Sequence, residues 1–258
     1  MQWMAAGDLG KFMKVVGVLQ ARIDSSRLPN KVVLPLFQDS PVIAIQSQRL
    51  AKSGIEWWLA TTTKKSDDLT SKWAESLGFK VFRGSVDDVL SRFQEIQKIT
   101  NADWIVRATG DDPMMNSEMV LHLIAAAKSA SESVDLICDM PNNRQFPLGF
   151  CPEIVRGKSL LKISSSIKPT ENYHKAHVTS FFLDKSSSAL VLPELPNRSN
   201  WRWTVDTDLD LDMMSKLLNL INNNWIDQEY IDTVKSLDLH PEIFCLNLAV
   251  KQKNIEEG

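Results

Sequence analysis

Short apolar runs alternate with amphipathic segments along the first half of the chain. Runs typical of buried strands occupy residues 15–19, 55–61, 80–82, 104–108 and 135–138. Between them, apolar residues recur at helical spacing, as in Leu69, Trp73 and Leu77. This alternation predicts an α/β fold, a mostly parallel sheet covered by helices on both faces.

Capping and turn residues predict where the helices begin and end. Asp39-Ser40-Pro41 predicts the start of a helix that stops at Gly54. Gly84-Ser85 predicts the start of another helix, and Asn116 predicts the cap of a helix that ends near Lys128.

The regular alternation of predicted strands and helices stops between residues 139 and 200, where six prolines interrupt any long element. We expect a small lobe here, inserted into a single domain of residues 13–258. Regular order returns with a predicted strand at 201–205 and helices around 209–221 and 227–237. Residues 1–12 show no periodicity, and we expect a disordered or non-native start.

Composition narrows the classes of partner. The 258 residues are 43% hydrophobic and 24% charged, with a net charge of -3, so neither nucleic acid nor a membrane is an expected partner. No apolar run approaches the roughly 20 residues that cross a bilayer. The three cysteines lie far apart in the sequence, at Cys138, Cys151 and Cys245, so neither a zinc site nor a disulfide framework is predicted. This cysteine usage favours a reduced, cytoplasmic compartment.

A basic loop follows the first predicted strand. Arg22, Arg27 and Lys31 place three cations in a segment that a buried parallel strand delivers to the carboxyl edge of the sheet, where ligands bind in open α/β folds. The chain has no glycine-rich phosphate loop, so side chains would have to hold phosphate. We expect a nucleoside triphosphate here, although a solvated surface turn is the simpler alternative.

Two aspartates also follow predicted strands. If Asp111 and Asp206 end neighbouring strands, their carboxylates converge on the basic loop and can hold Mg²⁺ together with the phosphates. Each aspartate alone could be a helix cap or a turn residue. We favour that simpler role for Asp208, Asp210 and Asp212.

The segment from Gln20 to Val32 resembles the opening signature of nucleotidyltransferases that activate acidic sugars with CTP. The match is to the acylneuraminate and spore-coat polysaccharide cytidylyltransferase branch, which reads roughly Q-A-R-x-G-S-x-R-L-P-G-K-V. Asp24 and Asn30 stand where that family usually has glycine. Asparagine tolerates positive φ, whereas Asp24 adds negative charge beside the phosphate site. The resemblance spans about residues 13–215 and implies a Rossmann-like, GT-A-like nucleotidyltransferase fold of three layers.

Later motifs of that family recur in order. G-D-x-P and V-D-T-x-x-D match Asp111 and Asp206, R-G-S-x-x-D-V-L-x-R-[FY] matches residues 83–93, and an A-T pair matches the end of the second strand. The residues that the resemblance assigns to the nucleotide are Gln20, Ala21, Arg22, Ala60, Thr61, Arg83, Gly84, Ser85 and Arg107.

Residues 174–179, H-K-A-H-V-T, resemble the family's E-H-V-T, with Ala176 where glutamate is common. Lys175 and His177 are therefore acceptor-side candidates. The two histidines could bind metal from a helix, but without a third ligand a hydrogen-bonding role is favoured. Arg144 could hold a sugar carboxylate bidentately, or it could be an ordinary loop arginine.

Together the motifs imply Mg²⁺-dependent transfer of CMP from CTP to a sialic-acid-like or ulosonic acid, for surface polysaccharide or glycan synthesis, by a homodimer. The residues expected to act in catalysis are Arg22, Arg27, Lys31, Asp111 and Asp206, the last two also as metal ligands. Three alternatives stay open: a nucleotidyltransferase using GTP or UTP with a sugar 1-phosphate, a glycosyltransferase, and a non-catalytic sugar-nucleotide binding protein.

Overall fold

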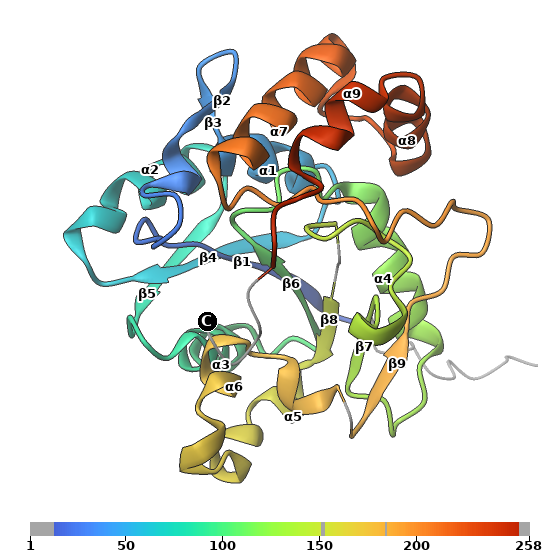
Figure 1. Cartoon of the computed structure of the whole chain (residues 1–258). Helices are drawn as coiled ribbons and strands as arrows, with labels where there is room; N and C mark the ends of the chain where they lie inside the picture. Colours follow the sequence, from blue (N-terminus) through green and yellow to red (C-terminus); the bar gives the residue numbers. More distant parts are fainter. Residues whose placement is uncertain (1–12, 151–152, 184, 253–258) are drawn as a thin grey trace, which may run out of the picture.

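A seven-stranded sheet runs through the centre of the molecule in the order β5-β4-β1-β6-β8-β7-β9 (Figure 1). The computed structural model describes residues 13–150, 153–183 and 185–252. The sheet strands are β1 (Val15–Gln20), β4 (Glu56–Thr62), β5 (Lys80–Gly84), β6 (Trp104–Thr109), β7 (Leu136–Cys138), β8 (Glu153–Arg156) and β9 (Ser187–Ala189). A small hairpin consists of β2 (Pro35–Phe37) and β3 (Ser40–Pro41).

The four strands β5, β4, β1 and β6 are parallel, and β1 lies between β4 and β6. Further along the sheet, β8 is antiparallel to both of its neighbours, β6 and β7. The predicted mostly parallel α/β sheet is therefore confirmed. Because parallel strands end at the same edge, the loops after β1, β4, β5 and β6 lie together there.

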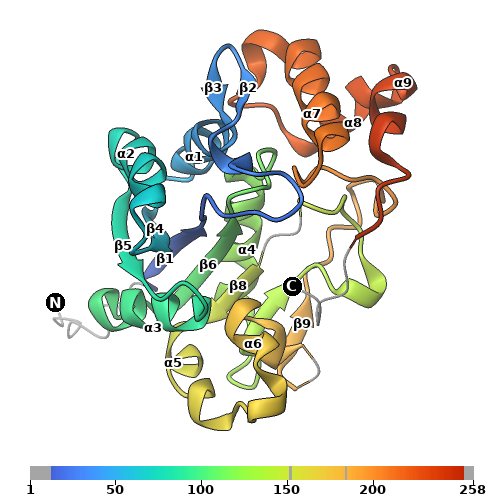
Figure 2. The same cartoon turned by 60° about the vertical axis from the view of Figure 1, so that its left-hand side comes forward.

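Helices cover both faces of the sheet (Figure 2). One face carries α1 (Val42–Ala51), α2 (Asp68–Ser76) and α4 (Ser117–Ser129), with α7 (Asp208–Ile221), α8 (Tyr230–Asp238) and α9 (Pro241–Phe244) beyond them. The other face carries α3 (Val89–Thr100), α5 (Gly157–Leu160) and α6 (Tyr173–Ala176). Short 3-10 helices lie at Lys31–Val33, Lys65–Asp67, Pro141–Asn143, Ile163–Ser166, Pro169–Glu171, Ser180–Phe182, Asn222–Asn224 and Cys245–Asn247.

Alternation along the strands produces the two cores. Val16 and Val18 of β1 pack with the α3 side, while Leu19 packs with the α1 side. Successive strand residues point to opposite faces, so a strand covered on both faces is apolar throughout. The continuous apolar runs of the sequence are the consequence.

Helix ends agree with the predicted caps only in part. Asn116 caps α4 by accepting a hydrogen bond from the Met119 amide, as predicted. The predicted start at Gly84-Ser85 is wrong, because Gly84 ends β5 and the Asp88 side chain caps α3 instead. Pro41 occupies the N-cap of α1 rather than its first turn.

The strand predicted at residues 201–205 is also wrong. This segment forms only an isolated bridge between Arg202 and Leu148, and its other amides bond irregularly to loops. The Trp203 amide donates to the Leu148 carbonyl, and the Val205 amide donates to the Asp111 carbonyl at 2.8 Å. The chain therefore reaches Asp206 through loop contacts rather than through a regular strand.

The proline-rich stretch 139–200 contributes two strands, β8 and β9, to the main sheet. The segment 1–12 lies outside the described residues. Within the described part of the chain, no helix is long and apolar enough to span a membrane.

Gly149 fixes the loop that pairs with residues 201–204. Its φ is +91°, and a Cβ there would lie 2.4 Å from the Thr204 backbone nitrogen. We predict that Gly149→Ala lowers the free energy of unfolding by about 3 kcal/mol, because strain and a backbone clash add. Gly54 has a φ of +71° with open space around it, so the control Gly54→Ala should lose only about 1 kcal/mol. Urea denaturation measures both, and equal losses would contradict the clash.

Candidate functional site

The basic loop after β1 is tied to the neighbouring strand ends by hydrogen bonds. The Gly110 amide donates to the Gln20 carbonyl at 2.8 Å, and the Ala21 amide donates to the Ala60 carbonyl. The Ile23 amide donates at 2.7 Å to the carboxylate of Asp67, which is buried. Asp67 has no distinctive motif around it, and the sequence analysis missed it.

The loop turns back at Asn30, whose φ of 61° lies in the left-handed region. This is the conformation for which asparagine is the mildest replacement of glycine. A 3-10 helix begins at the next residue and directs Lys31 back over the sheet edge. Asp24 is the other position where the family usually has glycine. It pairs with Lys64 at 2.5 Å, and this pairing lowers the pKa of Asp24.

Lys31 lies between the two predicted carboxylates. Its Nζ is 2.6 Å from Asp111 Oδ2 and 2.7 Å from Asp206 Oδ1. Arg27 Nη2 is 2.8 Å from the other oxygen of Asp206. The structure thus brings four residues of three distant segments into direct contact, and we call them the acid-base cluster.

Charge and burial oppose each other in this cluster. Burial would raise the pKa of Asp206, but Lys31, Arg27 and Arg202 hold it below its usual value. Burial would lower the pKa of Lys31, but the two carboxylates raise it. Both groups are therefore ionised at neutral pH. Arg27 Nη1 is buried and has no hydrogen-bond partner among the described residues.

The two carboxylates fit a single divalent cation. Both already present one oxygen to the same cationic atom, and two carboxylates are as many protein ligands as Mg²⁺ often takes when phosphates and waters supply the rest. In the described part of the chain, no group of three or more His, Cys, Asp or Glu side chains is placed to hold a metal. A metal ion and the Lys31 ammonium cannot occupy this position together, so Lys31 would have to leave it before a metal could bind there.

Two of the arginines predicted to bind the nucleotide, Arg22 and Arg83, reach different parts of the sheet edge. Arg22 Nη1 donates to the Val86 carbonyl at 3.1 Å, so it reaches the turn between β5 and α3 that also contains Ser85. Arg83 instead bonds to the Thr62 carbonyl and to Asp68, beside α2. Gly84 is the last residue of β5, and Ala60 and Thr61 lie near the end of the neighbouring strand β4.

Arg107 connects the end of β1 to the acceptor-side segment. It donates to the Gln20 side chain at 3.0 Å and to Glu153 at 2.7 Å. Thr179 donates to the same Glu153 oxygen at 2.6 Å. The chain of contacts places residues 177–179 close to the end of β1. Glu153 was not anticipated, because nothing in the sequence shows that β8 pairs with β6.

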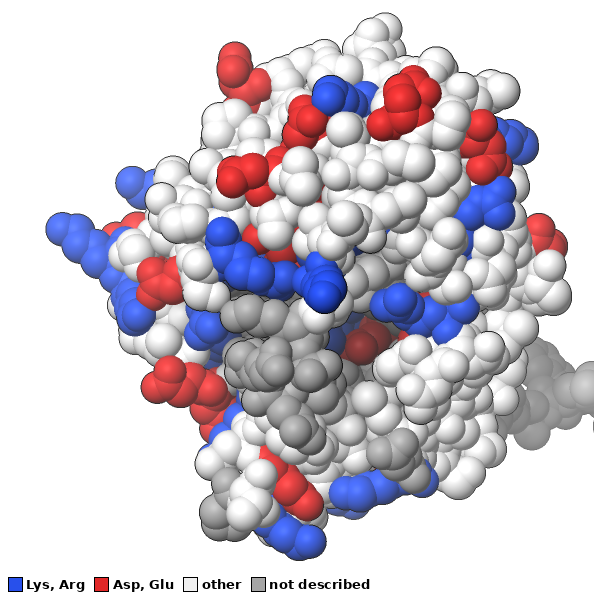
Figure 3. Space-filling model, in the orientation of Figure 1, with Lys and Arg blue, Asp and Glu red and all other residues white. Residues whose placement is uncertain are grey.

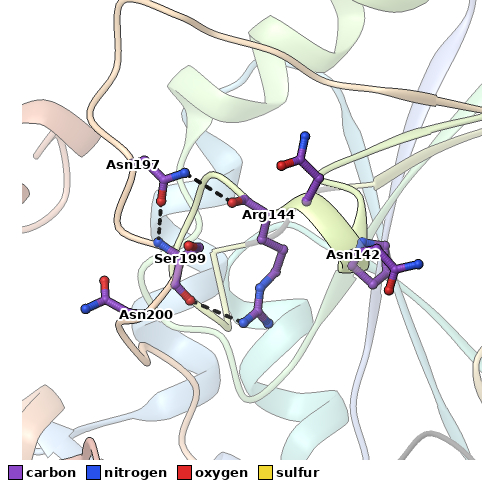
Figure 4. Close-up of a pocket in the computed structure, with 7 residues that line it drawn as sticks. Asn142, Arg144, Asn197, Ser199 and Asn200 are labelled. Carbon is purple, nitrogen blue, oxygen red and sulfur yellow. Dashed lines mark hydrogen bonds between the residues drawn. The ribbon is translucent and has the colours of Figure 1, made fainter.

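The three acceptor-side candidates lie in different places. Arg144 donates to the Ser199 carbonyl at 3.2 Å. It lines a shallow polar pocket of about 380 Å³ (Figure 4). Lys175 lies on α6 and His177 follows it, on the α3 side of the sheet. In the space-filling view, Lys and Arg side chains border a hollow near the middle of the face (Figure 3).

Comparison with known proteins identifies similar chains. The family described as Cytidylyltransferase matches residues 16–192. An uncharacterized protein of Methanocaldococcus jannaschii is 34% identical, covering 95% of this chain and 99% of its own length. Spore coat polysaccharide biosynthesis protein SpsF of Bacillus subtilis is 30% identical, over 79% of this chain and 85% of its own. The solved structure of a cytidylyltransferase from Leptospira borgpetersenii has a TM-score of 0.81 at 25% identity, covering 94% of this chain and 100% of that one. Cytidylyltransferases of 3-deoxy-manno-octulosonate are also among the relatives.

Removal of the Lys31 ammonium should destabilise the protein in metal-free buffer. Lys31→Met leaves two carboxylates facing each other at a site where Asp206 is 6% exposed, so we expect a loss of about 3 kcal/mol. The control Lys52→Met breaks an exposed pair with Asp227 and should lose under about 1 kcal/mol. Thermal unfolding with EDTA measures both. A Lys31→Met protein as stable as the control would contradict the account.

Asp112 should make stability fall as the pH rises toward neutral. Burial, together with the charge of Asp111, raises the pKa of Asp112 to about 7. A carboxyl whose pKa is higher in the folded state stabilises below its unfolded value near 4, and that contribution is lost as the pH rises through 7. We expect the melting temperature of Asp112→Asn to lie about 2–4 °C above that of wild type at pH 8. At pH 4 the two proteins should melt at the same temperature. The melting temperature of the exposed control Asp212→Asn should depend on pH as that of wild type does. If Asp112→Asn also showed the wild-type pH dependence, the raised pKa of Asp112 would be contradicted.

Proposed function

We propose that this chain, which belongs to the cytidylyltransferase family, transfers the cytidylyl group of CTP to a hydroxyl group of an acidic sugar and releases pyrophosphate. The observation that carries the proposal is the acid-base cluster. Asp111 and Asp206 meet at one cation beside Arg27 and Lys31, at the sheet edge where the family motifs converge. This is the charge arrangement that a metal-bound triphosphate requires.

The chain's own residues would act mainly by position and charge. Arg27 has an unpaired buried donor, Nη1, and Lys31 becomes available once it leaves the carboxylates. These two cations would bind the phosphates and neutralise the departing pyrophosphate, with Arg22 close to the turn that borders the nucleotide.

The metal requirement is part of the proposal. Asp111 and Asp206 would hold Mg²⁺, which supplies charge neutralisation at the α-phosphate when bound. The acceptor hydroxyl oxygen attacks the α-phosphorus in line, the bond to the β-phosphate bridging oxygen breaks, and the hydroxyl proton passes to water. No covalent intermediate with the protein is needed.

The relatives and the local charge support an acidic sugar as the acceptor. Relatives act in spore coat polysaccharide biosynthesis and on 3-deoxy-manno-octulosonate. Arg107 lies beside Gln20 and is linked through Glu153 to the segment of His177, with Lys175 on the preceding helix. We assign the carboxylate of the sugar to this side of the site. A cytoplasmic homodimer is the setting that we propose with it.

Nucleotide selectivity tests the proposal directly. With Mg²⁺, CTP should raise the melting temperature more than GTP, UTP or ATP, because a ligand that binds only the native state stabilises it. Pyrophosphate release with CTP and a panel of acidic sugars then measures turnover. A preference for GTP or UTP with a sugar 1-phosphate, or transfer without pyrophosphate, would favour one of the alternative reactions.

Loss of one metal carboxylate should stop the reaction without unfolding the protein. We expect Asp111→Asn to lower the rate of pyrophosphate release at least about 100-fold while its circular dichroism spectrum stays unchanged. The control Asp227→Asn alters an exposed carboxylate paired with Lys52 and should keep the wild-type rate. Wild-type turnover in Asp111→Asn would refute the role of this residue.

A further inference from the structure

A second group of charged residues lies behind Asp206, away from Lys31. Arg202 donates from Nη2 to Asp206 Oδ2 at 2.8 Å and from Nε to Asp210 Oδ1 at 2.8 Å. Arg202 is 5% exposed and Asp210 is fully buried. Burial of this kind leaves little freedom to either side chain, because an unpaired charge here would be costly.

The two oxygens of Asp206 have different partners. Oδ2 accepts from Arg202 and lies 2.8 Å from Arg27, whereas Oδ1 faces Lys31 and, through it, Asp111. One oxygen is thus anchored from behind, and the other is presented toward the position proposed for the metal. The Asp206 amide also donates to Asp210 at 3.0 Å. Arg202 therefore holds the side chain of Asp206, and Asp210, the partner of Arg202, holds its backbone.

The carboxyl-terminal part of the chain completes this arrangement. Asn247 Nδ2 donates to Asp210 Oδ1 at 2.9 Å and to the Arg202 carbonyl at 3.0 Å, and Asn247 is fully buried. Arg202 Nη1 donates to the Gln252 side chain at 2.7 Å. Residues that lie beyond the family motifs therefore contact the residue that holds a motif aspartate.

A helix cap alone does not require this construction. Asp210 and Thr207 form a capping box that satisfies the first amides of α7. That box uses Asp210 without any arginine. The bidentate reach of Arg202 to Asp206 and Asp210, closed by Asn247, instead restricts the rotamer of Asp206.

We propose that Arg202 is a positioning residue, which Asp210 and Asn247 hold in place so that Asp206 presents Oδ1 to the metal and nucleotide. This inference rests on the proposed function. Partners that orient a metal ligand typically change metal affinity 10–100-fold when they are altered. The carboxyl-terminal segment thereby becomes part of the site.

The test compares Arg202→Lys with the control Arg198→Lys. A lysine keeps the charge but reaches only one of the two carboxylates, whereas Arg198 pairs with Asp238 at the surface. Free Mn²⁺ is measured by electron paramagnetic resonance in the presence of α,β-methylene CTP. We expect the dissociation constant for Mn²⁺ to rise at least about 10-fold in Arg202→Lys and to stay unchanged in Arg198→Lys.

A second pair of variants leaves Arg202 itself unchanged. Asn247→Ala removes two donors from the group, and the control Asn219→Ala removes an exposed amide that bonds to the Ser215 carbonyl. We expect at least about 3-fold weaker Mn²⁺ binding in Asn247→Ala alone, and partial recovery of turnover at high Mg²⁺. This pair decides the matter if Arg202→Lys does not fold.

The outcomes separate the two proposals. Wild-type Mn²⁺ affinity in a folded Arg202→Lys, or in Asn247→Ala if the lysine variant does not fold, would overturn the positioning role and leave the proposed function intact. A wild-type protein that binds no Mn²⁺ with the CTP analogue would overturn the proposed function itself, and the positioning role with it.

Discussion

The contact of one ammonium with two carboxylates organises this molecule. Asp111 and Asp206 carry like charges at short range, and at this half-buried edge their repulsion would be large if nothing lay between them. Lys31 neutralises it, with Arg27 on the flank. In the function that we propose, a divalent cation with its nucleotide takes the same position, and Lys31 occupies it until they bind.

The fold explains how distant segments reach this point. β1 and β6 are parallel neighbours, so their carboxyl ends deliver the basic loop and Asp111 to one edge. Asp206 arrives differently, because the segment before it bonds to Leu148 and to the Asp111 carbonyl instead of joining the sheet. The buried Arg202 pairs with both Asp206 and Asp210 at 2.8 Å and so holds the Asp206 carboxylate from the side opposite Lys31.

The sequence predicted the strands β1, β4, β5 and β6 well because each is a short apolar run bounded by polar turns. It also marked Arg27, Lys31, Asp111 and Asp206, because they follow predicted strands and match motifs of the family that the sequence resembles. It could not reveal Glu153 or Asn247, because their roles depend on which distant segments pair, and local periodicity carries no such information. The failed strand at 201–205 has the same cause, since an extended apolar segment does not show whether a strand or a loop lies beside it.

The most direct test is a crystal structure of the wild-type protein with Mn²⁺ and α,β-methylene CTP. The account predicts an anomalous Mn²⁺ peak bound by Asp111 and Asp206, with the Lys31 ammonium moved from between them to the phosphates. A peak elsewhere, or nucleotide bound while Lys31 still joins the two carboxylates, would contradict it.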